Sequence, residues 1–234
     1  MAGVDIGRKR WPTGPAQVDT SHPLGAGLTF LFAKSFSVKA GWIDSDTTAL
    51  TTTSGLGASD LSSGLMRSRV ASGGPPCSFA AVFRWTSGQM HLLSNDGDAG
   101  VVGGLTGAGD RCWQFRCVTS NEINFLAFDS TASSLPVNFA LPITSGVPYA
   151  AVVSLTAGRS AEMRVMNLTT SNVSVVSSTA SSTGGWVGSN GHLGDTGRFD
   201  AVSGNVAAVY RWSRALSSSG MDMFLADPYC MLRA

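Results

Sequence analysis

The sequence predicts an all-β protein, in which two antiparallel sheets pack as a sandwich and one short helix lies near the C-terminus. Two observations predict this fold class. Strand-like segments recur roughly every ten to fifteen residues with turn signals between them, a spacing typical of antiparallel sandwiches. Charged residues make up only 13% of the chain, which contains 28 glycines. This composition favours strands joined by small-residue turns, since helices are usually rich in Glu, Lys and Leu.

The strand predicted over residues 204–212 has the clearest pattern. Alternate residues from Val206 to Trp212 lie on one side, and Ala207 and Val209 lie on the other. A strand that is apolar on both faces needs cover on both faces, so we expect it in the middle of a sheet. A short helix is predicted over 217–227. Before the strand, residues 185–188 predict a short strand that leads into a polar loop through 195 and 198.

The strand over 79–85 is predicted to be half-buried, because Phe79, Ala81, Phe83 and Trp85 share one face. Residues 90–94 and 101–105 are predicted to form a hairpin around a turn at 95–98. A second pair is expected between 111–118 and 122–128, followed by a polar link at 129–134. Further strands are predicted over 28–33, 36–43, 47–53, 147–155, 161–168 and 173–176.

Residues 1–21 are predicted to form an extended arm, and residues 22–234 a single domain. The arm contains Arg8, Lys9, Arg10 and Trp11 and shows no sustained hydrophobic period. Three basic residues release few counterions, so nucleic acid is not the expected partner. We interpret these four residues as a candidate interface that orders when the arm docks on another protein.

Net charge and cysteine positions limit the partners and the disulfides that the chain can have. The formal net charge is +1, which gives no overall attraction to nucleic acid or to a membrane surface. Cys112 and Cys117 have an odd spacing in one strand and therefore lie on opposite faces, which excludes a bridge between them. Cys77 and Cys230 could meet only if the fold brings them together. We expect free thiols in a protein that matures in a reducing cytosol.

Three short stretches carry a resemblance to a known fold family: His22-Pro23-Leu24 before the first strand, the apolar–Arg–Trp strand 79–85, and the end of the chain from Gly185-Trp186-Val187-Gly188 through Arg214-Ala215-Leu216-Ser217 to Asp227-Pro228-Tyr229. They resemble concanavalin A-like (laminin-G/pentraxin-type) jelly-roll domains of the kind found in bacteriophage virion proteins. The resemblance implies the jelly-roll topology. It says little about activity, because this fold hosts enzymes, lectins and structural proteins.

Enzymatic chemistry is not expected. Retaining glycoside hydrolysis needs two carboxyl groups about 5 Å apart. The glucanases of this fold carry them in the pattern Glu-x-Asp-x-(x)-Glu on one face of one strand, whereas Glu122 and Glu162 fall in different predicted strands and neither begins that pattern. Asp96 and Asp98 are assigned to a turn. Ser189 lies near His192 on a predicted loop, without a nucleophile elbow. We therefore predict no catalytic residue.

No metal or cofactor is predicted either. Residues 95–98 supply oxygen ligands that calcium prefers, but a hairpin turn explains them equally well. Carbohydrate binding without hydrolysis is the stronger alternative, because aromatic rings on a sheet can stack on sugars. The candidate tryptophans are expected to fill the core instead: Trp42, Trp85, Trp113, Trp186 and Trp212.

The sequence thus predicts a non-enzymatic bacteriophage virion protein, assembled in the host cytoplasm. Its preferred role is capsid decoration, in which the arm and the sheet-edge loops dock on the major capsid protein or another virion protein. A homo-oligomer, with a trimer as one option, is expected by analogy with such proteins. The alternative is a lectin-like module of a phage fibre or tail that binds host glycans.

Overall fold

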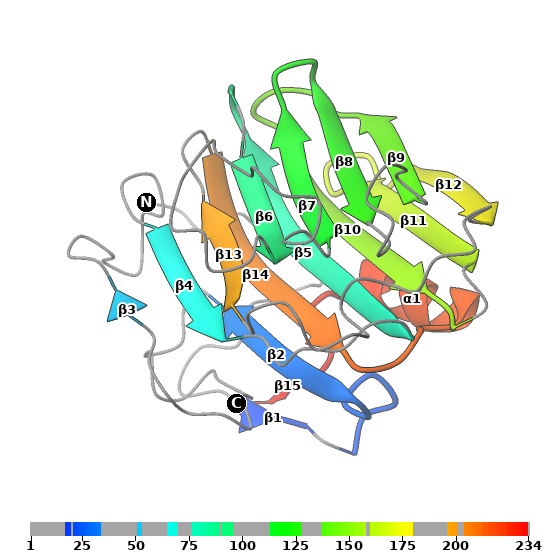
Figure 1. Ribbon diagram of the computed structural model, residues 1–234. Helices are drawn as coiled ribbons and strands as arrows, with labels where there is room; N and C mark the ends of the chain where they lie inside the picture. Colours follow the sequence, from blue (N-terminus) through cyan, green and yellow to red (C-terminus); the bar gives the residue numbers. More distant parts are fainter. Residues whose placement is uncertain are drawn as a thin grey trace.

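The computed structural model describes residues 17–19, 21–33, 51–52, 65–69, 76–88, 90–95, 113–127, 137–157, 160–179, 196–200 and 204–233. Within these ranges the chain forms two facing antiparallel sheets and one short helix, so the predicted fold class is confirmed (Figure 1). We find no helix in the same ranges that is long and apolar enough to span a lipid bilayer.

The first sheet has six strands in the order β12-β11-β10-β5-β14-β2, and all neighbours are antiparallel. It is the rear one of the two sheets in Figure 1. Its strands are β2 (Leu28–Ala33), β5 (Cys77–Trp85), β10 (Pro148–Leu155), β11 (Ser160–Asn167), β12 (Val173–Thr179) and β14 (Gly204–Trp212).

The second sheet has seven strands in the order β3-β4-β13-β6-β7-β8-β9, also antiparallel throughout. Its strands are β3 (Thr51–Thr52), β4 (Leu65–Arg69), β6 (Met90–Asn95), β7 (Trp113–Val118), β8 (Glu122–Ala127), β9 (Val137–Pro142) and β13 (Thr196–Asp200). A separate two-stranded ladder joins β1 (Gln17–Val18) to β15 (Leu232–Arg233) near the C-terminus.

Two apolar cores lie on opposite faces of the six-stranded sheet. The inter-sheet core fills the space between the two sheets, and its largest fully buried residues are Phe79, Phe83, Phe115, Phe125 and Phe139. The helix-side core lies under α1 (Ser218–Ala226), and its largest fully buried residues are Leu24, Leu31, Tyr210, Trp212 and Phe224. The six-stranded sheet is therefore covered on both faces, as the central layer of three.

This layering explains β14 and corrects the prediction for β5. Strand β14 lies between β5 and β2, with Tyr210 and Trp212 in the helix-side core and Val209 in the inter-sheet core, so its predicted mid-sheet position is confirmed. The prediction of a half-buried β5 is wrong. Ala80 and Val82, on its second face, are buried in the helix-side core. Because Ala80 is small, the sequence pattern did not identify this second face of β5 as apolar.

Three further differences concern the second sheet. The predicted hairpin of 90–94 with 101–105 is wrong, because β6 pairs with β7 on one edge and β13 on the other. The stretch around Arg198, expected as a loop, is strand β13. Strand β9 was not predicted, although Val137, Phe139 and Leu141 alternate with polar and small residues. The predicted pair β7–β8 is confirmed, and the strands predicted over 147–155 and 161–168 are β10 and β11, which pair with each other.

Helix α1 begins and ends close to where the sequence predicts it. Ser217 is the N-cap, and its hydroxyl accepts a hydrogen bond from the Gly220 N–H at 3.2 Å. Asp227 is the C-cap, and its N–H donates to the Met223 carbonyl at 3.1 Å. Met221, Phe224 and Leu225 point into the helix-side core. The helix is held by this apolar face, since nine residues are too few for a stable isolated helix.

The described residues that carry the family resemblance meet in one place. The Trp212 indole N–H donates to the Leu24 carbonyl at 2.6 Å, and the Arg214 guanidinium donates to the carbonyls of Pro23 and Ala26 at 2.7 and 2.6 Å. Gly27 allows this close approach. Its φ is +73°, and a side chain there would lie 3.1 Å from the Arg214 Cδ. These signature residues thus have a structural role, which is why they indicate a fold rather than an activity.

Candidate functional site

The predicted arm interface lies outside the described residues: Arg8, Lys9, Arg10 and Trp11 are not placed. The structure does place the end of the arm nearest the body. Gln17 and Val18 pair with Arg233 and Leu232, and the Asp19 N–H donates to the Met231 carbonyl at 2.7 Å. The described chain is therefore attached to the body beside β15 from Gln17 onward.

The two glutamates weighed as a catalytic pair lie in different sheets. Glu122 is on β8 of the seven-stranded sheet, where it accepts a hydrogen bond from the Ser120 hydroxyl at 2.8 Å. Glu162 is on β11 of the six-stranded sheet and forms an ion pair with Arg164. These two carboxylates therefore do not flank a common substrate. Asp96, Asp98, Ser189 and His192 lie outside the described residues.

Two of the five candidate tryptophans are placed, and both fill cores as predicted. Trp85 is 2% exposed and its indole N–H donates to the Gly88 carbonyl at 3.0 Å. Trp212 is fully buried against Tyr210 and Phe224. Neither ring can stack on a sugar at the surface. Trp42, Trp186 and the side chain of Trp113 lie outside the described residues.

The three described cysteines are free thiols, in agreement with the prediction. Cys77 and Cys117 belong to the inter-sheet core, and Cys230 packs at the margin of the helix-side core. Burial raises the pKa of the Cys117 thiol far above its usual range. Burial and the negative charge of Asp227 raise the pKa of Cys230 to about 11. Both groups stay protonated at neutral pH, which makes them poor nucleophiles and poor metal ligands.

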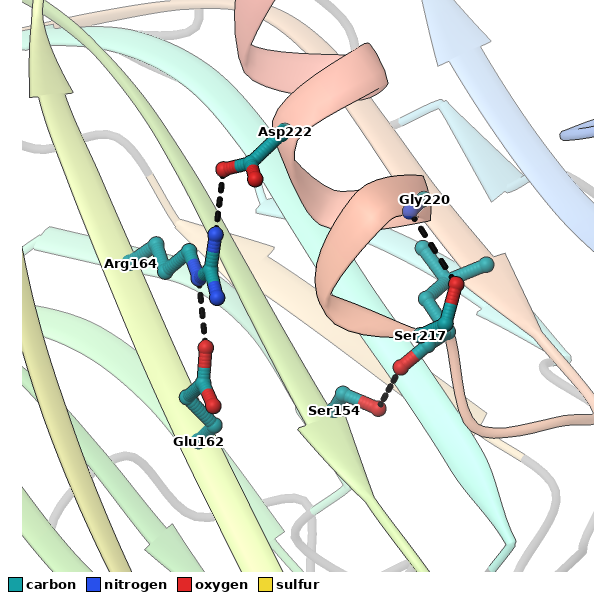
Figure 2. Close-up of polar contacts among 7 residues, drawn as sticks. Ser154, Glu162, Arg164, Ser217, Gly220 and Asp222 are labelled. Atoms are coloured by element: carbon teal, nitrogen blue, oxygen red, sulfur yellow. Dashed lines mark hydrogen bonds and ion pairs between the residues drawn. The ribbon is translucent and has the colours of Figure 1, made fainter.

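The outer face of the six-stranded sheet carries a charged cluster beside α1 (Figure 2). The Arg164 guanidinium, on β11, donates both to Glu162 on the same strand and to Asp222 on α1. Burial by itself would lower the pKa of Arg164, but the hydrogen bonds to Asp222 and Glu162 raise it above its usual value. The cluster ties the exposed side of α1 to β11 and leaves the single cation with two carboxylate partners.

Next to this cluster, the outermost strand of the same sheet exposes apolar side chains. Val175 is the cross-strand partner of Arg164, and Val173 is the partner of Met166. Val175 is 52% exposed and Val173 is 45% exposed, the largest values among the big apolar residues of the described chain. The mixture of valine and serine over 173–178 is the sequence signal for a strand, but it does not indicate that the strand lies at an edge.

The outer face of the seven-stranded sheet is polar by contrast. Arg116 on β7 lies opposite Asn124 on β8, and Asn124 lies opposite Ala140 on β9. Both polar side chains are half-buried. The Asn124 Oδ1 atom is buried and accepts no hydrogen bond within the described structure.

Among the described residues two surfaces are candidates for binding: the exposed apolar edge at β12 and the half-buried polar face at Arg116 and Asn124. Sequence reasoning missed both. Polar residues alternate with apolar ones along β7 and β8, so the polar face is visible in the pattern. Its half-burial and the unpaired acceptor depend on neighbours in three strands, which no single segment reveals.

No family model matches the chain, and no curated protein is similar to it. Solved structures do share its fold. A mutant of the protein HCR/D aligns over 70% of this chain and 41% of its own, with a TM-score of 0.50 and 6% identity. Tailspike protein 2 of Escherichia coli O157:H7 bacteriophage CAB120 aligns over 71% and 23%, with a TM-score of 0.48 and 17% identity.

The LG1-3 region of the laminin α2 chain aligns over 66% of this chain and 31% of its own, with a TM-score of 0.46 and 15% identity. This chain therefore spans less than half the length of each of these proteins. At such identities the likeness is one of fold alone. The predicted concanavalin A-like jelly-roll fold is confirmed at that level.

Proposed function

We propose that this protein is a non-enzymatic structural module of a bacteriophage virion, which decorates the capsid by docking its N-terminal arm on the shell. The observation that carries the proposal is the ladder between β1 and β15, which fixes the arm to the body immediately before residue 17. A basic and aromatic segment held at a rigid point can contact a partner without disturbing the sandwich. The phage-like signatures around Arg214 and Tyr229 support the virion assignment.

The separation of the two glutamates supports the non-enzymatic part. Glu122 and Glu162 lie in different sheets, and the Glu162 carboxylate is held by Arg164. The low charge of the chain suits a protein that packs against its neighbours in a coat. In this role each arm contact is weak, and symmetry repeats it over the shell, so that avidity locks neighbouring capsomers together.

Two truncations test the arm. Deleting residues 1–16 keeps β1, whereas deleting residues 1–20 also removes the β1–β15 ladder. We expect both truncated chains to lose co-sedimentation with assembled capsids. Only the longer deletion should lower the melting temperature, because only it removes backbone hydrogen bonds of the body.

The matched control is the full chain with Arg8, Lys9 and Arg10 changed to Ala, which should weaken capsid binding and leave the melting temperature unchanged. Full binding by the 1–16 deletion would show that the arm is not the docking element. Co-purification of the full chain with tails or fibres, rather than with heads, would show that the protein is not located on the capsid.

A second candidate function is glycan binding by a fibre or tail module. The polar, half-buried side chains of Arg116 and Asn124, which are cross-strand partners on the outer face of the seven-stranded sheet, favour it, because polar groups on a sheet face can fix the orientation of a sugar. A glycan array tests it. Binding that is lost in Asn124→Ala and kept in Asn138→Ala, an exposed residue on neighbouring β9, would support this function. If the wild-type chain bound no glycan on a broad array, the glycan-binding function would be rejected.

A further inference from the structure

Strand β12 forms one edge of the six-stranded sheet and lies at the margin of the molecule (Figure 1). It pairs with β11 over seven positions, and no strand of the described structure pairs with its other side. All of its residues except Val176 are exposed, and Val176 is half-buried. Strand β12 therefore presents an open, regular edge to solvent.

The hydrogen-bonding pattern shows which backbone groups face outward. The Asn167 N–H donates to the Asn172 carbonyl at 2.9 Å, which marks these two residues as a hydrogen-bonded pair of the β11–β12 hairpin. Antiparallel ladders alternate between hydrogen-bonded and non-bonded pairs. Val173, Val175, Ser177 and Thr179 are the non-bonded positions, so their N–H and C=O groups point away from β11.

This edge lacks the features that usually protect an exposed strand. Natural edges carry lysine, proline or a bulge, which prevent another strand from adding to the sheet. The β12 sequence VSVVSST contains no charged residue and no proline, and its register with β11 is unbroken. The charges next to it on β11, Arg164 and Glu162, pair with each other, and Arg164 also pairs with Asp222. Nothing in the β12 sequence or register therefore prevents another strand from pairing with this edge.

We propose that the β12 edges of two copies of this chain pair antiparallel across a two-fold axis, which joins the two six-stranded sheets into one continuous sheet. A two-fold axis places each residue opposite the residue of the second copy that is equally far from the axis. A charged residue close to the axis would then lie near its own copy, and β12 contains none. The strand is therefore compatible with its own copy as a partner.

Pairing centred on Val176 uses the whole strand. Val175 then lies opposite Ser177 of the second copy, and Val173 lies opposite Thr179, so all four outward-facing residues exchange backbone hydrogen bonds. The exposed valines contact β-branched or small side chains across the interface. Strand β9 packs near β12 across the sandwich, so the margin of the second sheet lies beside the same interface. This inference does not depend on the proposed virion role.

The test is the mass of the full chain in solution, measured by light scattering and sedimentation equilibrium from micromolar to hundreds of micromolar concentrations. We expect a concentration-dependent species of twice the 24.2 kDa chain mass. Val175→Pro removes an outward N–H and no β11 bond, and Val175→Lys places two like charges near the axis. Each should raise the dimer dissociation constant at least about tenfold.

Val175→Thr is the matched control, because it keeps the backbone donor, the β-branch and the neutral charge, and it should dimerise as the wild type does. Unchanged melting temperatures of dilute, monomeric variants would show that the sandwich remains folded. Hydrogen exchange at 173–179 should slow as the wild-type concentration rises. A wild-type chain that stays monomeric, a trimer, or a dimer that tolerates both variants would overturn the proposal.

Discussion

The two cores on either side of the six-stranded sheet are built by different means. The inter-sheet core is held by side-chain packing alone at its centre, where Phe79 and Phe125 lie 5.7 Å apart between ring centroids. The helix-side core combines packing with hydrogen bonds to irregular backbone. Its Tyr210 hydroxyl donates to the Pro228 carbonyl at 2.7 Å, and its Trp212 donates to Leu24.

The two cores differ in this way because they stabilise different kinds of backbone. Two sheets satisfy their own backbone groups within their ladders, so apolar surface is sufficient to join them. The helix-side core must also fix the turn at 21–27 and the C-terminal residues 227–231, where the carbonyls of Leu24 and Pro228 accept from side chains instead of a strand ladder. Polar groups on buried aromatic rings supply those partners.

Truncation of one phenylalanine in each core should give the largest effects. Phe125 and Phe224 are both fully buried, so Phe125→Ala and Phe224→Ala should each cost about 3–5 kcal/mol of unfolding free energy. Hydrogen exchange should separate them. Phe224→Ala should release 218–233 before the sheets, whereas Phe125→Ala should loosen both sheets together. Equal loss of protection everywhere in Phe224→Ala would show that the helix-side core is not a separable layer.

Alkaline pH should weaken the helix-side core through its two buried tyrosines. Burial raises the pKa of Tyr210, and burial with the charge of Asp227 raises that of Tyr229. Unfolded tyrosines ionise near pH 10, below the folded values, so this contribution is complete below about pH 10 and is lost as the pH rises further. The unfolding free energy should fall by about 1.4 kcal/mol per pH unit for each tyrosine.

Urea titrations at successive pH values from neutrality upward measure this slope. In Tyr229→Phe the slope above pH 10 should be smaller by about 1.4 kcal/mol per unit, since one titrating group is removed. A slope that is the same in the variant would show that the Tyr229 hydroxyl does not stay protonated in the folded state.

A smaller effect is expected from the buried serines that hold the link between β14 and α1. The Ser78 hydroxyl accepts from the Leu216 N–H at 2.8 Å and donates to the Arg214 carbonyl at 3.0 Å. The Ser154 hydroxyl donates to the Leu216 carbonyl at 2.8 Å (Figure 2). Ser78→Ala leaves two backbone groups without this partner and should cost about 1–3 kcal/mol, more than Ser154→Ala, which affects one.

Ser177→Ala, at an exposed position of β12, serves as the control and should change the unfolding free energy by less than about 0.5 kcal/mol. Thermal and urea unfolding of the three variants measure the order of their losses in unfolding free energy. If Ser78→Ala were as mild as Ser177→Ala, the hydroxyl network would not be what positions α1 on the sheet.

The contrast between the cores also explains what sequence patterns could predict. The inter-sheet core depends on period-2 alternation, so Phe79, Phe83 and the strands β7, β8, β10 and β11 were predicted from local sequence. The helix-side core depends on contacts between residues about 190 positions apart, such as Trp212 with Leu24. Alternation places Trp212 in a core but does not identify the carbonyl that it binds.

Pairing partners were harder to predict than strands. Residues 90–95 form a strand as expected, but the following strand-like segment is not the neighbour of β6, because β7 and β13 occupy its two edges. Hairpin prediction assumes that neighbours in sequence pair, which Greek-key connections violate. The open edge at β12 was missed for the same reason, since an edge is defined by a strand that does not pair.

The smallest expected effect concerns the thiols, which report on how tightly each core excludes water. Because the pKa of Cys230 is about 11, against 9.0 for an ordinary thiol, its thiolate fraction near pH 8 is lower by about 100-fold. Cys230 is half-buried and Cys117 is fully buried, so Cys230 should react slowly with a disulfide reagent and Cys117 only after unfolding. The measurement uses the Cys112→Ser chain, with the denatured protein as the reference for complete reaction. Rapid modification of Cys117 in the native chain would mean that the inter-sheet core opens more readily than the helix-side core, the reverse of the order that their construction predicts.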